Sequence, residues 1–294
     1  MKVAIYGQYY QNSTQPIIND IFVFFTKNNV EMIIEANFLS MIYERKLVEN
    51  QYKTFSSHTE LDSSFDMLIS IGGDGTILRA ATLVRDSGIP ILGINAGRLG
   101  FLASVQKENI ASFLQSVLDK KYTLSKRALI SINCSTPNES IEEMNFAMNE
   151  ITVSRKDTTA MITIDTYLNG EYLNSYWADG LIISTPTGTT GYNLSCGGPI
   201  LTPDVRSLVL TPIAPHNLTT RPLVIPDDTE IRLKVSGREA NYLVSLDSRV
   251  TSVKNESILT LNKTPFHINM VEIPQETFVK TLRNKLLWGE DKRN

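Results

Sequence analysis

A glycine-rich turn, Gly72-Gly73-Asp74-Gly75-Thr76, joins an apolar run to a helical pattern. The run Met67–Ile71 has the length and composition of a buried strand, and helical spacing begins near Ile77. Such a turn presents backbone N–H groups and the positive end of a helix dipole to an anion, so it predicts a phosphate site. Because Asp74 alone would repel a phosphate, its carboxylate indicates proton acceptance from an attacking hydroxyl, or the holding of a phosphate-bound metal.

Strand and helix patterns alternate through residues 1–122. This alternation predicts an α/β domain with a parallel sheet, whose ligands lie beyond the carboxyl ends of the strands. Asn95, which follows the strand after the Asp74 turn, is therefore expected beside that turn. The apolar strands are predicted at Val3–Tyr6, Val30–Ile34, Met67–Ile71 and Ile89–Ile94, with amphipathic helices between and after them.

Near Thr123 the pattern changes to short alternating runs, which predict a β-rich domain. Asn169-Gly170 follows one such run and is a strong signal for a two-residue hairpin. From Pro274 to Trp288 the apolar spacing is helical again, and this helix is expected to return to the first domain. The predicted organisation is an α/β domain at 1–122, a β-rich domain at 123–270 and a C-terminal helical segment at 271–294.

Composition narrows the range of partners. The chain has 294 residues, a net charge of −3 and no long Lys/Arg run, so neither nucleic acid nor a membrane surface is an expected partner. No apolar stretch approaches the ~18 residues of a membrane span. The N-terminus lacks a signal-peptide pattern, so a cytoplasmic location is expected. The two cysteines, Cys134 and Cys196, are expected to be reduced thiols.

Two polar segments of the β-rich half bear candidate binding groups. Asn149-Glu150 precedes a β-like run. An amide beside a carboxylate can bridge both hydroxyls of a ribose, although such a pair also occurs at solvated strand ends. The run from Ser184 to Ser195 is dense in hydroxyls and glycines and opens a short helix. It suits a polar ligand of low net charge, or it is a plain Ser/Thr loop.

Together these segments resemble the NAD kinase family. The resemblance covers most of the chain and rests on GGDGT at 72–76, GINAGRLGFL at 93–102, NE at 149–150, DGLIISTPTGTTGYNLSCGGPI at 179–200 and PIAPHNLTTRPLVIP at 212–226. It implies transfer of the γ-phosphoryl group of ATP to the 2′-hydroxyl of the adenosine ribose of NAD, which gives NADP. Mg²⁺ is expected to arrive on ATP, because the sequence has no His/Cys/carboxylate cluster with metal-ligand spacing, and no metal-binding residue is predicted.

The resemblance also assigns roles to single residues. Asp74 matches the family's proton acceptor, and Asp179 matches a position near the nicotinamide that is sometimes supplied by a neighbouring subunit, which implies a homo-oligomer, a dimer or a tetramer. Trp177, two residues before Asp179, is expected on the same strand face. Arg79 is expected to reach a phosphate or to lie in solvent. The residues expected on this basis to bind ATP or NAD are Gly72, Gly73, Gly75, Thr76, Arg79, Asn95, Asn149, Glu150, Trp177, Asp179, Thr187, Thr190, Gly191, Tyr192, Asn193, Leu194, Ser195, Ala214, Asp247 and Arg249.

Two positions depart from the family pattern. Gly191 stands where the family often has alanine, which loosens the turn. Asp247-Ser248-Arg249 stands where the family has an acidic residue, glycine and glutamine. Arginine adds a charge and a fork of donors, so Arg249 meets a phosphate or carboxylate, or else faces solvent.

Two other functions compete with NAD phosphorylation. A lipid or sugar kinase would share the turn around Asp74, but would need an apolar or basic membrane patch, or more arginines for a second phosphate. A non-catalytic dinucleotide sensor would use the same scaffold. The intact Asp74 argues against a sensor, since binding alone does not need a proton acceptor.

Overall fold

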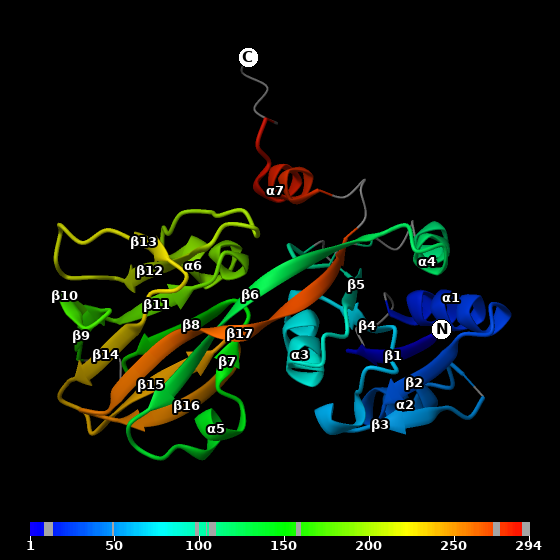
Figure 1. The fold of residues 1–294 in the computed structure, drawn as a ribbon, viewed down its shortest axis with the longest axis horizontal. Coiled ribbons are helices and arrows are strands. Elements are labelled where there is room, and N and C mark those ends of the chain that lie inside the picture. Colours follow the sequence, from blue (N-terminus) through cyan, green and yellow to red (C-terminus); the bar gives the residue numbers. More distant parts are fainter. Residues whose placement is uncertain are drawn as a thin grey trace. The chain divides into compact units, whose positions relative to one another are not determined.

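The computed structural model describes residues 1–8, 14–48, 50–97, 100–103, 105, 110–156, 160–272 and 277–289. The chain forms two compact units, one made of Met1–Lys126 with Ile268–Asn294 and the other of Arg127–His267 (Figure 1). These divisions lie a few residues from the boundaries predicted at 122/123 and 270/271. Each unit has its own hydrophobic core.

A parallel sheet forms the centre of the first unit. The strands predicted for this half are confirmed, whereas the short edge strand β3 carried no signal, because only its last residue is buried. At the other edge the end of β17 pairs with β5 through Met270 and Ile91. The order is β3 (Lys53–Phe55), β2 (Glu31–Glu35), β1 (Lys2–Gly7), β4 (Met67–Gly72), β5 (Ile91–Asn95) and the end of β17 (Ile258–Glu272).

Helices cover both faces of this sheet. Leu92 and Ile94 of β5 belong to the core cluster that also holds side chains of α1 (Thr14–Lys27), α2 (Ala36–Glu44) and α4 (Ile110–Leu118). Gly93 lies between these two residues and so faces the opposite side. There a Cβ on Gly93 would lie 2.5 Å from Ile77 of α3 (Asp74–Val84), so glycine allows α3 to pack closely on β5. A 3-10 turn, η1, spans His58–Glu60.

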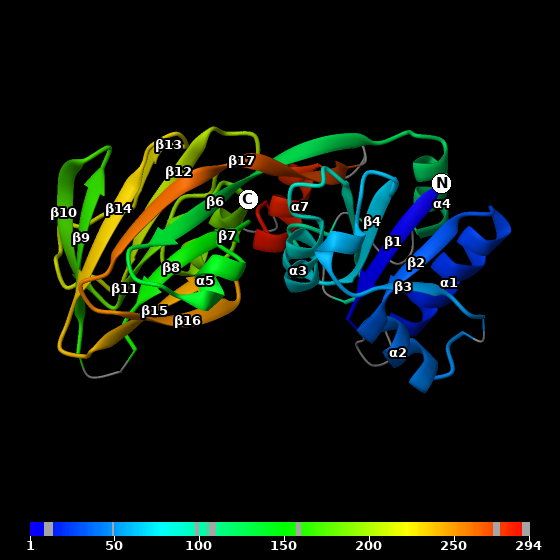
Figure 2. The same ribbon diagram turned by 60° about the horizontal axis from the view of Figure 1, so that its bottom comes forward.

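The second unit contains strands of two sheets, which are labelled in Figure 2: part of the 11-stranded sheet that continues through β17 into the parallel strands, and a six-stranded antiparallel sheet. The first sheet contains β10 (Glu171–Ala178), β9 (Ile162–Leu168), β14 (Ile231–Ser236), β17, β6 (Thr123–Cys134) and β7 (Phe146–Ala147). The second has the order β13 (Leu223–Pro226), β12 (Ser207–Ile213), β11 (Gly180–Ser184), β8 (Glu150–Ser154), β15 (Asn241–Leu246) and β16 (Arg249–Lys254). The short helical elements are α5 (Glu139–Glu143), η3 (Thr187–Thr190) and α6 (Tyr192–Ser195).

Alternating side chains of the two sheets form the core of the second unit. Ile231, Leu233 and Val235 of β14 are fully buried in the same cluster as Ile151 and Val153 of β8. This period of two is what the alternating runs predicted. The hairpin predicted at Asn169-Gly170 is confirmed, since β9 and β10 pair across it and both turn residues have positive φ.

The C-terminal segment belongs to the first unit by contact. Its helix, α7 (Phe278–Leu286), begins after Thr277, whose side chain accepts a hydrogen bond from the Lys280 N–H. Residues 274–276 of the predicted helix lie outside the described residues. None of the α7 side chains is buried, whereas Val271 of β17 is fully buried in the sheet core. The strand rather than the helix therefore anchors this segment.

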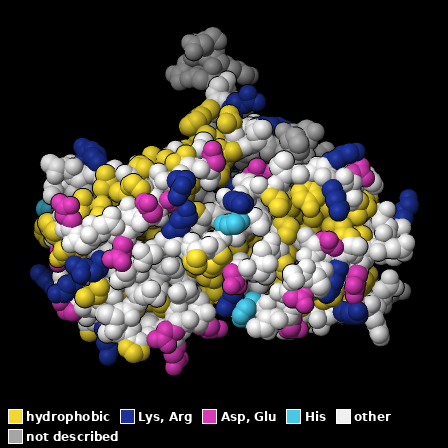
Figure 3. All heavy atoms as spheres, viewed as in Figure 1, with side chains coloured by type: hydrophobic (Ala, Val, Ile, Leu, Met, Phe, Trp, Pro, Cys, Tyr) yellow, Lys and Arg dark blue, Asp and Glu magenta, His cyan; other side chains and the backbone are white. Residues whose placement is uncertain are grey.

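Charged groups of both signs are interspersed on the face of the molecule in Figure 3. In the part of the chain that the structure describes, no helix has both the length and the apolar character needed to cross a bilayer.

Candidate active site

Asp74 is the first residue of α3, at the carboxyl end of β4. Its carboxylate accepts hydrogen bonds from the backbone N–H groups of Phe101 (2.7 Å) and Leu102 (3.0 Å). A Cβ on Gly100 would lie only 1.9 Å from Asp74 Oδ1. Glycine at position 100 therefore lets the 100–102 segment close around the carboxylate and hold its orientation.

The two glycines that flank Asp74 leave the start of α3 open. A Cβ on Gly73 or Gly75 would meet no protein atom within 4 Å. By contrast, a Cβ on Gly72 would lie 2.2 Å from Thr76 Oγ1, and this hydroxyl donates to Gln8 Oε1 at 3.2 Å. Gly72 and Thr76 thus shape the turn from inside, while the open helix N-terminus has room for an anion.

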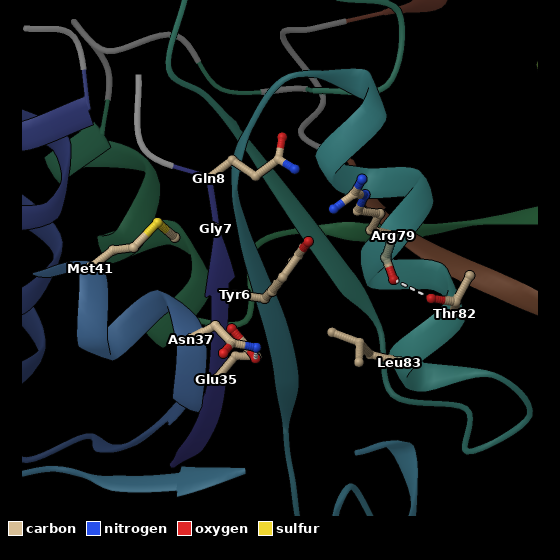
Figure 4. A pocket seen from close by; sticks show the side chains of 9 residues that line it. All are labelled: Tyr6, Gly7, Gln8, Glu35, Asn37, Met41, Arg79, Thr82 and Leu83. Carbon is tan, nitrogen blue, oxygen red and sulfur yellow. Dashed lines mark hydrogen bonds between the residues drawn. The ribbon is translucent and has the colours of Figure 1, made fainter. Parts of the chain in front are cut away.

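A pocket of about 320 Å³ lies beside this turn in the first unit (Figure 4). Arg79 of α3 is exposed and lines it. Glu35, 6% exposed at the end of β2, accepts hydrogen bonds from Asn37 Nδ2 (3.0 Å) and the Phe38 N–H (2.8 Å), and so caps α2. The full lining is Tyr6, Gly7, Gln8, Glu35, Asn37, Met41, Arg79, Thr82 and Leu83. Sequence reasoning missed Glu35, although an acidic residue that ends a buried strand was a usable signal.

Asn95 ends β5 at the same edge of the sheet, as predicted. Its side chain closes a local turn, because Nδ2 donates to the Gly97 carbonyl (2.9 Å) and Oδ1 accepts from the Gly97 N–H (3.2 Å). This geometry gives Asn95 a role in shaping the loop. Whether it also meets a nucleotide stays a prediction. Arg98 and Leu99 of the predicted motif lie outside the described residues.

In the second unit Asn149 lies in a bend and Glu150 is the first residue of β8; residues 148–150 are here called the 148–150 segment. Asn149 Oδ1 and Glu150 Oε2 are buried and have no hydrogen-bond partner among the described residues. Burial, and then the nearby Asp247 carboxylate, raise the pKa of Glu150 to about 8, against the opposing effect of a hydrogen bond from the Tyr192 N–H. Two buried acceptors without donors are costly unless a ligand supplies hydroxyl groups.

Residues 185–195 form a loop that closes on the 148–150 segment. Thr185 Oγ1 donates to the Met148 carbonyl at 2.6 Å, and the Thr185 N–H donates to the Asn149 carbonyl at 2.9 Å. A Cβ on Gly188 would lie 2.1 Å from that same Asn149 carbonyl oxygen. The predicted hydroxyl-rich run is thus packed tightly on the Asn-Glu pair, and its glycine permits the contact.

The side chains of this loop differ in whether they are used inside the loop or remain accessible to a ligand. Thr190 Oγ1 donates to the Thr187 carbonyl, and Asn193 is fully buried and hydrogen-bonded to Thr189, Pro199 and Thr211. These groups stabilise the loop. The exposed or partly exposed members are Thr190, Gly191, Tyr192, Leu194 and Ser195, and Tyr192 is 45% exposed. Dinucleotide binding by any of them stays a prediction.

Asp179 connects β10, which ends at Ala178, to β11, which begins at Gly180. The expectation that Trp177 and Asp179 share a strand face is therefore wrong, since Asp179 is in the connection and not in the strand. Asp179 Oδ2 pairs with Arg155 at 3.0 Å. Trp177 is 49% exposed and contacts the His216 ring with centroids 4.3 Å apart. Ala214, close by in sequence to His216, is exposed with φ 43°.

Asp247 and Arg249 both bind backbone groups next to Asn149. The Asp247 carboxylate accepts from the N–H groups of residues 148, 149 and 150, and the Arg249 guanidinium donates to the carbonyls of Met144 and Phe146. Arg249 is thus not simply a solvent-facing arginine. The prediction that either side chain binds a nucleotide is untested, and the contacts indicate a structural role in the site.

No group of three or more His, Cys, Asp or Glu residues suited to holding a metal occurs in the described part of the chain. The first unit offers a glycine-rich turn with an open helix N-terminus and a carboxylate, and the second unit offers paired acceptors for hydroxyl groups. The class defined by these features is a two-domain protein that binds phosphate and a polyhydroxylated ligand.

Similarity to known proteins places the chain within that class. Residues 14–122 match the family model of the ATP-NAD kinase N-terminal domain, and residues 148–273 match that of the ATP-NAD kinase C-terminal domain. The chain is 74% identical to an NAD kinase of Flavobacterium johnsoniae and 53% identical to an NAD kinase of Christiangramia forsetii, in each case over 100% of both chains. The chain therefore belongs to the NAD kinase family.

Two solved structures have the same fold. A yeast NADH kinase complexed with NADH has a TM-score of 0.87 at 22% identity, covering 99% of this chain and 89% of that chain. An NAD kinase from Archaeoglobus fulgidus in complex with ATP has a TM-score of 0.72 at 25% identity, covering 97% of each. The predicted fold class, an α/β domain with a parallel sheet and a β-rich domain, is confirmed.

Proposed function

We propose that this protein transfers the γ-phosphoryl group of ATP to the 2′-hydroxyl of the adenosine ribose of NAD and releases ADP and NADP. In this reaction a bond forms between the ribose oxygen and the γ-phosphorus. The bond from that phosphorus to the β,γ-bridging oxygen breaks, and the hydroxyl proton passes to the enzyme. Family membership supports this reaction over that of a lipid or sugar kinase.

The observation that carries the proposal is the pair of unpartnered oxygens on Asn149 and Glu150. The hydroxyls of a ribose diol can donate to two such buried acceptors when the substrate binds, and the 2′-hydroxyl proton turns to Asp74 for the transfer step. A protonated Glu150 can in addition donate to a ribose oxygen, and the raised pKa of about 8 favours that form at neutral pH. A lipid acyl chain has no hydroxyl donors for such a pair, and family membership, rather than the pair, separates NAD from a phosphorylated sugar.

Asp74 takes the role of general base. Its carboxylate is oriented by two backbone N–H groups, which leaves the remaining lone pairs of both oxygens for a proton or a cation. Because phosphoryl transfer passes through a loose transition state, little basicity is required before the new bond forms. Alignment of the hydroxyl with the phosphorus and stabilisation of charge supply most of the rate.

The phosphates of ATP bind at the open N-terminus of α3, and the donor nucleoside occupies the pocket lined by Arg79 and Glu35. The volume of about 320 Å³ is within the range of small-molecule sites. In Figure 4 the Arg79 guanidinium is directed to the same side as Tyr6 and Gln8, where it can meet a phosphate. Its planar fork of donors suits that contact.

The donor set fits a Mg²⁺ ion that is carried mainly by the phosphates. The turn offers it one carboxylate, Asp74, and Mg²⁺ commonly binds one or two carboxylates together with substrate phosphates and water. When bound, Mg²⁺ neutralises the charge that develops on the transferred group.

The direct test incubates the protein with ATP, Mg²⁺ and NAD and measures NADP. Asp74→Asn is expected to bind NAD normally and to lose turnover by ~100-fold or more, because the proton acceptor and its charge are removed, together with one of the two backbone hydrogen bonds. Asp86→Asn, an exposed aspartate beyond the end of α3, is the matched control and should retain activity. Tight NADP binding without turnover in the wild-type protein would instead support a sensor. Full turnover by Asp74→Asn would remove Asp74 from the mechanism.

The protein acts as a homo-oligomer, a dimer or a tetramer, in the cytoplasm. Large apolar side chains that the structure leaves exposed support self-association, among them Trp177 (49%) and Leu218 (89%) of the second unit and Trp288 (54%) of the first. ATP and NAD are its small-molecule partners.

A further inference from the structure

A single carboxylate gathers the backbone amides of the 148–150 segment. Asp247 Oδ1 accepts from the N–H groups of Asn149 (2.8 Å) and Glu150 (3.3 Å), and Oδ2 accepts from that of Met148 (3.1 Å). The Asp247 N–H donates back to the Glu150 carbonyl at 3.0 Å. Four hydrogen bonds thus connect one residue to three consecutive residues nearly one hundred positions earlier in the chain.

The fold holds Asp247 firmly in this place. Leu246 pairs with Ile151 on β8 and with Arg249 on β16, so Asp247 and Ser248 form the two-residue turn of the β15–β16 hairpin. Asp247 has φ 53°, a conformation that aspartate tolerates better than most residues. The hairpin therefore presents the carboxylate at the point where the β15–β8 ladder ends and the 148–150 segment begins.

The residue that follows this turn, Arg249, binds the carbonyls that precede the 148–150 segment. Arg249 Nη1 donates to the Met144 carbonyl at 2.9 Å, and Nη2 donates to the Phe146 carbonyl. This turn therefore holds residues 144–150 in two ways. Arg249 donates to backbone carbonyls of this stretch, and Asp247 accepts from its backbone N–H groups. Without Asp247, three N–H groups of a largely buried segment would lose their acceptor.

We propose that Asp247 is a positioning residue, whose carboxylate sets the 148–150 backbone so that Asn149 Oδ1 and Glu150 Oε2 face the adenosine ribose. The inference rests on the proposed function, because the ribose is the ligand that function assigns to this pair. Asp247 acts through Asn149 and Glu150 and does not itself contact the dinucleotide. Loss of the Asp247 carboxylate should therefore weaken recognition of the ribose hydroxyls and leave the KM for ATP unchanged.

The test measures whether Asp247 is needed to recognise those hydroxyls. Calorimetry gives the Kd of NAD and of an NAD analogue that lacks both hydroxyls of the adenosine ribose, for wild type and for Asp247→Ala. Wild type should prefer NAD by ~10- to 100-fold, the usual range for removing partners of buried polar groups. Asp247→Ala should bind both ligands about equally. A general loss of structure would weaken both ligands together and leave the preference between them unchanged.

Two further variants make the test specific. In Asp247→Asn, one oxygen can still accept from Asn149 and Glu150 while the bond to Met148 is lost, so an intermediate preference is expected. This variant decides the matter if Asp247→Ala does not fold. Ser248→Ala, in the same turn and exposed, should keep the wild-type preference.

The outcomes distinguish the positioning role of Asp247 from the proposed function. A wild-type preference that survives in both Asp247 variants would overturn the positioning role while leaving the proposed function intact. A wild-type protein that makes no distinction between NAD and the analogue would overturn the role of the Asn149-Glu150 pair, and the inference about Asp247 with it.

Discussion

At the scale of single residues, the site depends on a few side chains whose surroundings leave them little freedom. Asp74 is held by two backbone amides, and Glu150 is buried beside a second carboxylate. Both arrangements are set by neighbours far along the chain, Gly100 in one case and Asp247 in the other. The chemistry of each group therefore responds to changes at residues that bind no substrate.

Gly100→Ala should abolish most of the activity without touching a ligand. The new Cβ would lie 1.9 Å from Asp74 Oδ1, so the carboxylate or the 100–102 segment must move. A displacement of this kind costs ~100-fold in kcat, because the proton acceptor leaves its position. Gly97→Ala in the same loop is the control, since its Cβ meets nothing within 4 Å. Equal kcat values for the two variants would contradict the role given to Gly100.

Glu150 should make stability fall as pH rises. Its pKa is raised from 4.5 to about 8 in the folded protein, so between these values the folded state holds a proton that the unfolded state releases. The contribution of Glu150 to the free energy of unfolding is therefore greatest below pH 4.5 and is lost toward pH 8. Its slope is at most about 1.4 kcal/mol per pH unit. Asp247, whose pKa burial also raises, acts in the same direction.

Glu150→Gln mimics the protonated acid and should flatten this dependence between pH 4.5 and about 8. Urea unfolding across the range provides the measurement. Glu239→Gln, an exposed site of the same unit, should keep the wild-type slope. The assignment fails if Glu150→Gln and wild type show parallel curves.

At the scale of elements, strand ends and the loops that follow them carry the site. In the first unit, β1, β2, β4 and β5 end at the same edge of a parallel sheet, which gathers Gln8, Glu35, Asp74 and Asn95. In the second unit, β8 begins where β15 and β11 end, which brings the 148–150 segment against the 185–195 loop. Close backbone contact in that loop depends on glycine.

Gly188→Ala and Gly191→Ala should differ strongly. A Cβ at position 188 would lie 2.1 Å from the Asn149 carbonyl oxygen, so the loop must separate from the 148–150 segment, with a loss of stability of ~1–3 kcal/mol and weaker NAD binding. A Cβ at position 191 would lie 3.2 Å from Glu150 Oε2 and needs only a small adjustment. Thermal unfolding and the Kd of NAD measure both effects. Similar losses for the two variants would disprove this account of the loop.

At the scale of the whole molecule, each unit folds around its own core, and exposed apolar side chains remain on both. Light scattering should give the mass of two or four chains of 32.9 kDa, because such side chains are commonly covered by a second copy. Dilution should then lower the specific activity if a neighbouring subunit contributes Asp179 to the dinucleotide site. A fully active monomer would contradict the oligomer.

Much of the fold was predictable because its signals are local. The strands around Met67–Ile71, the hairpin at Asn169-Gly170 and the two-part organisation all follow from periodicity and turn chemistry. The short strand β3 was not predictable, because a three-residue edge strand buries only one side chain. The connection at Asp179 was not predictable either, because the end of a strand has no periodic pattern of its own. The pocket beside Arg79 was also missed, because its lining comes from four separate elements, the ends of β1 and β2 and the helices α2 and α3.

Local pattern and turn composition were enough to locate the turn around Asp74, the Asn-Glu pair and the family, because these depend on residues close together in the chain. The folded chain alone assigned Asp247 and Arg249 to the backbone of the 148–150 segment, and Gly100 to the Asp74 carboxylate. Contacts across so many residues are selected by strand pairing and close packing. Neither leaves a signal in the short segments from which secondary structure and motifs are read.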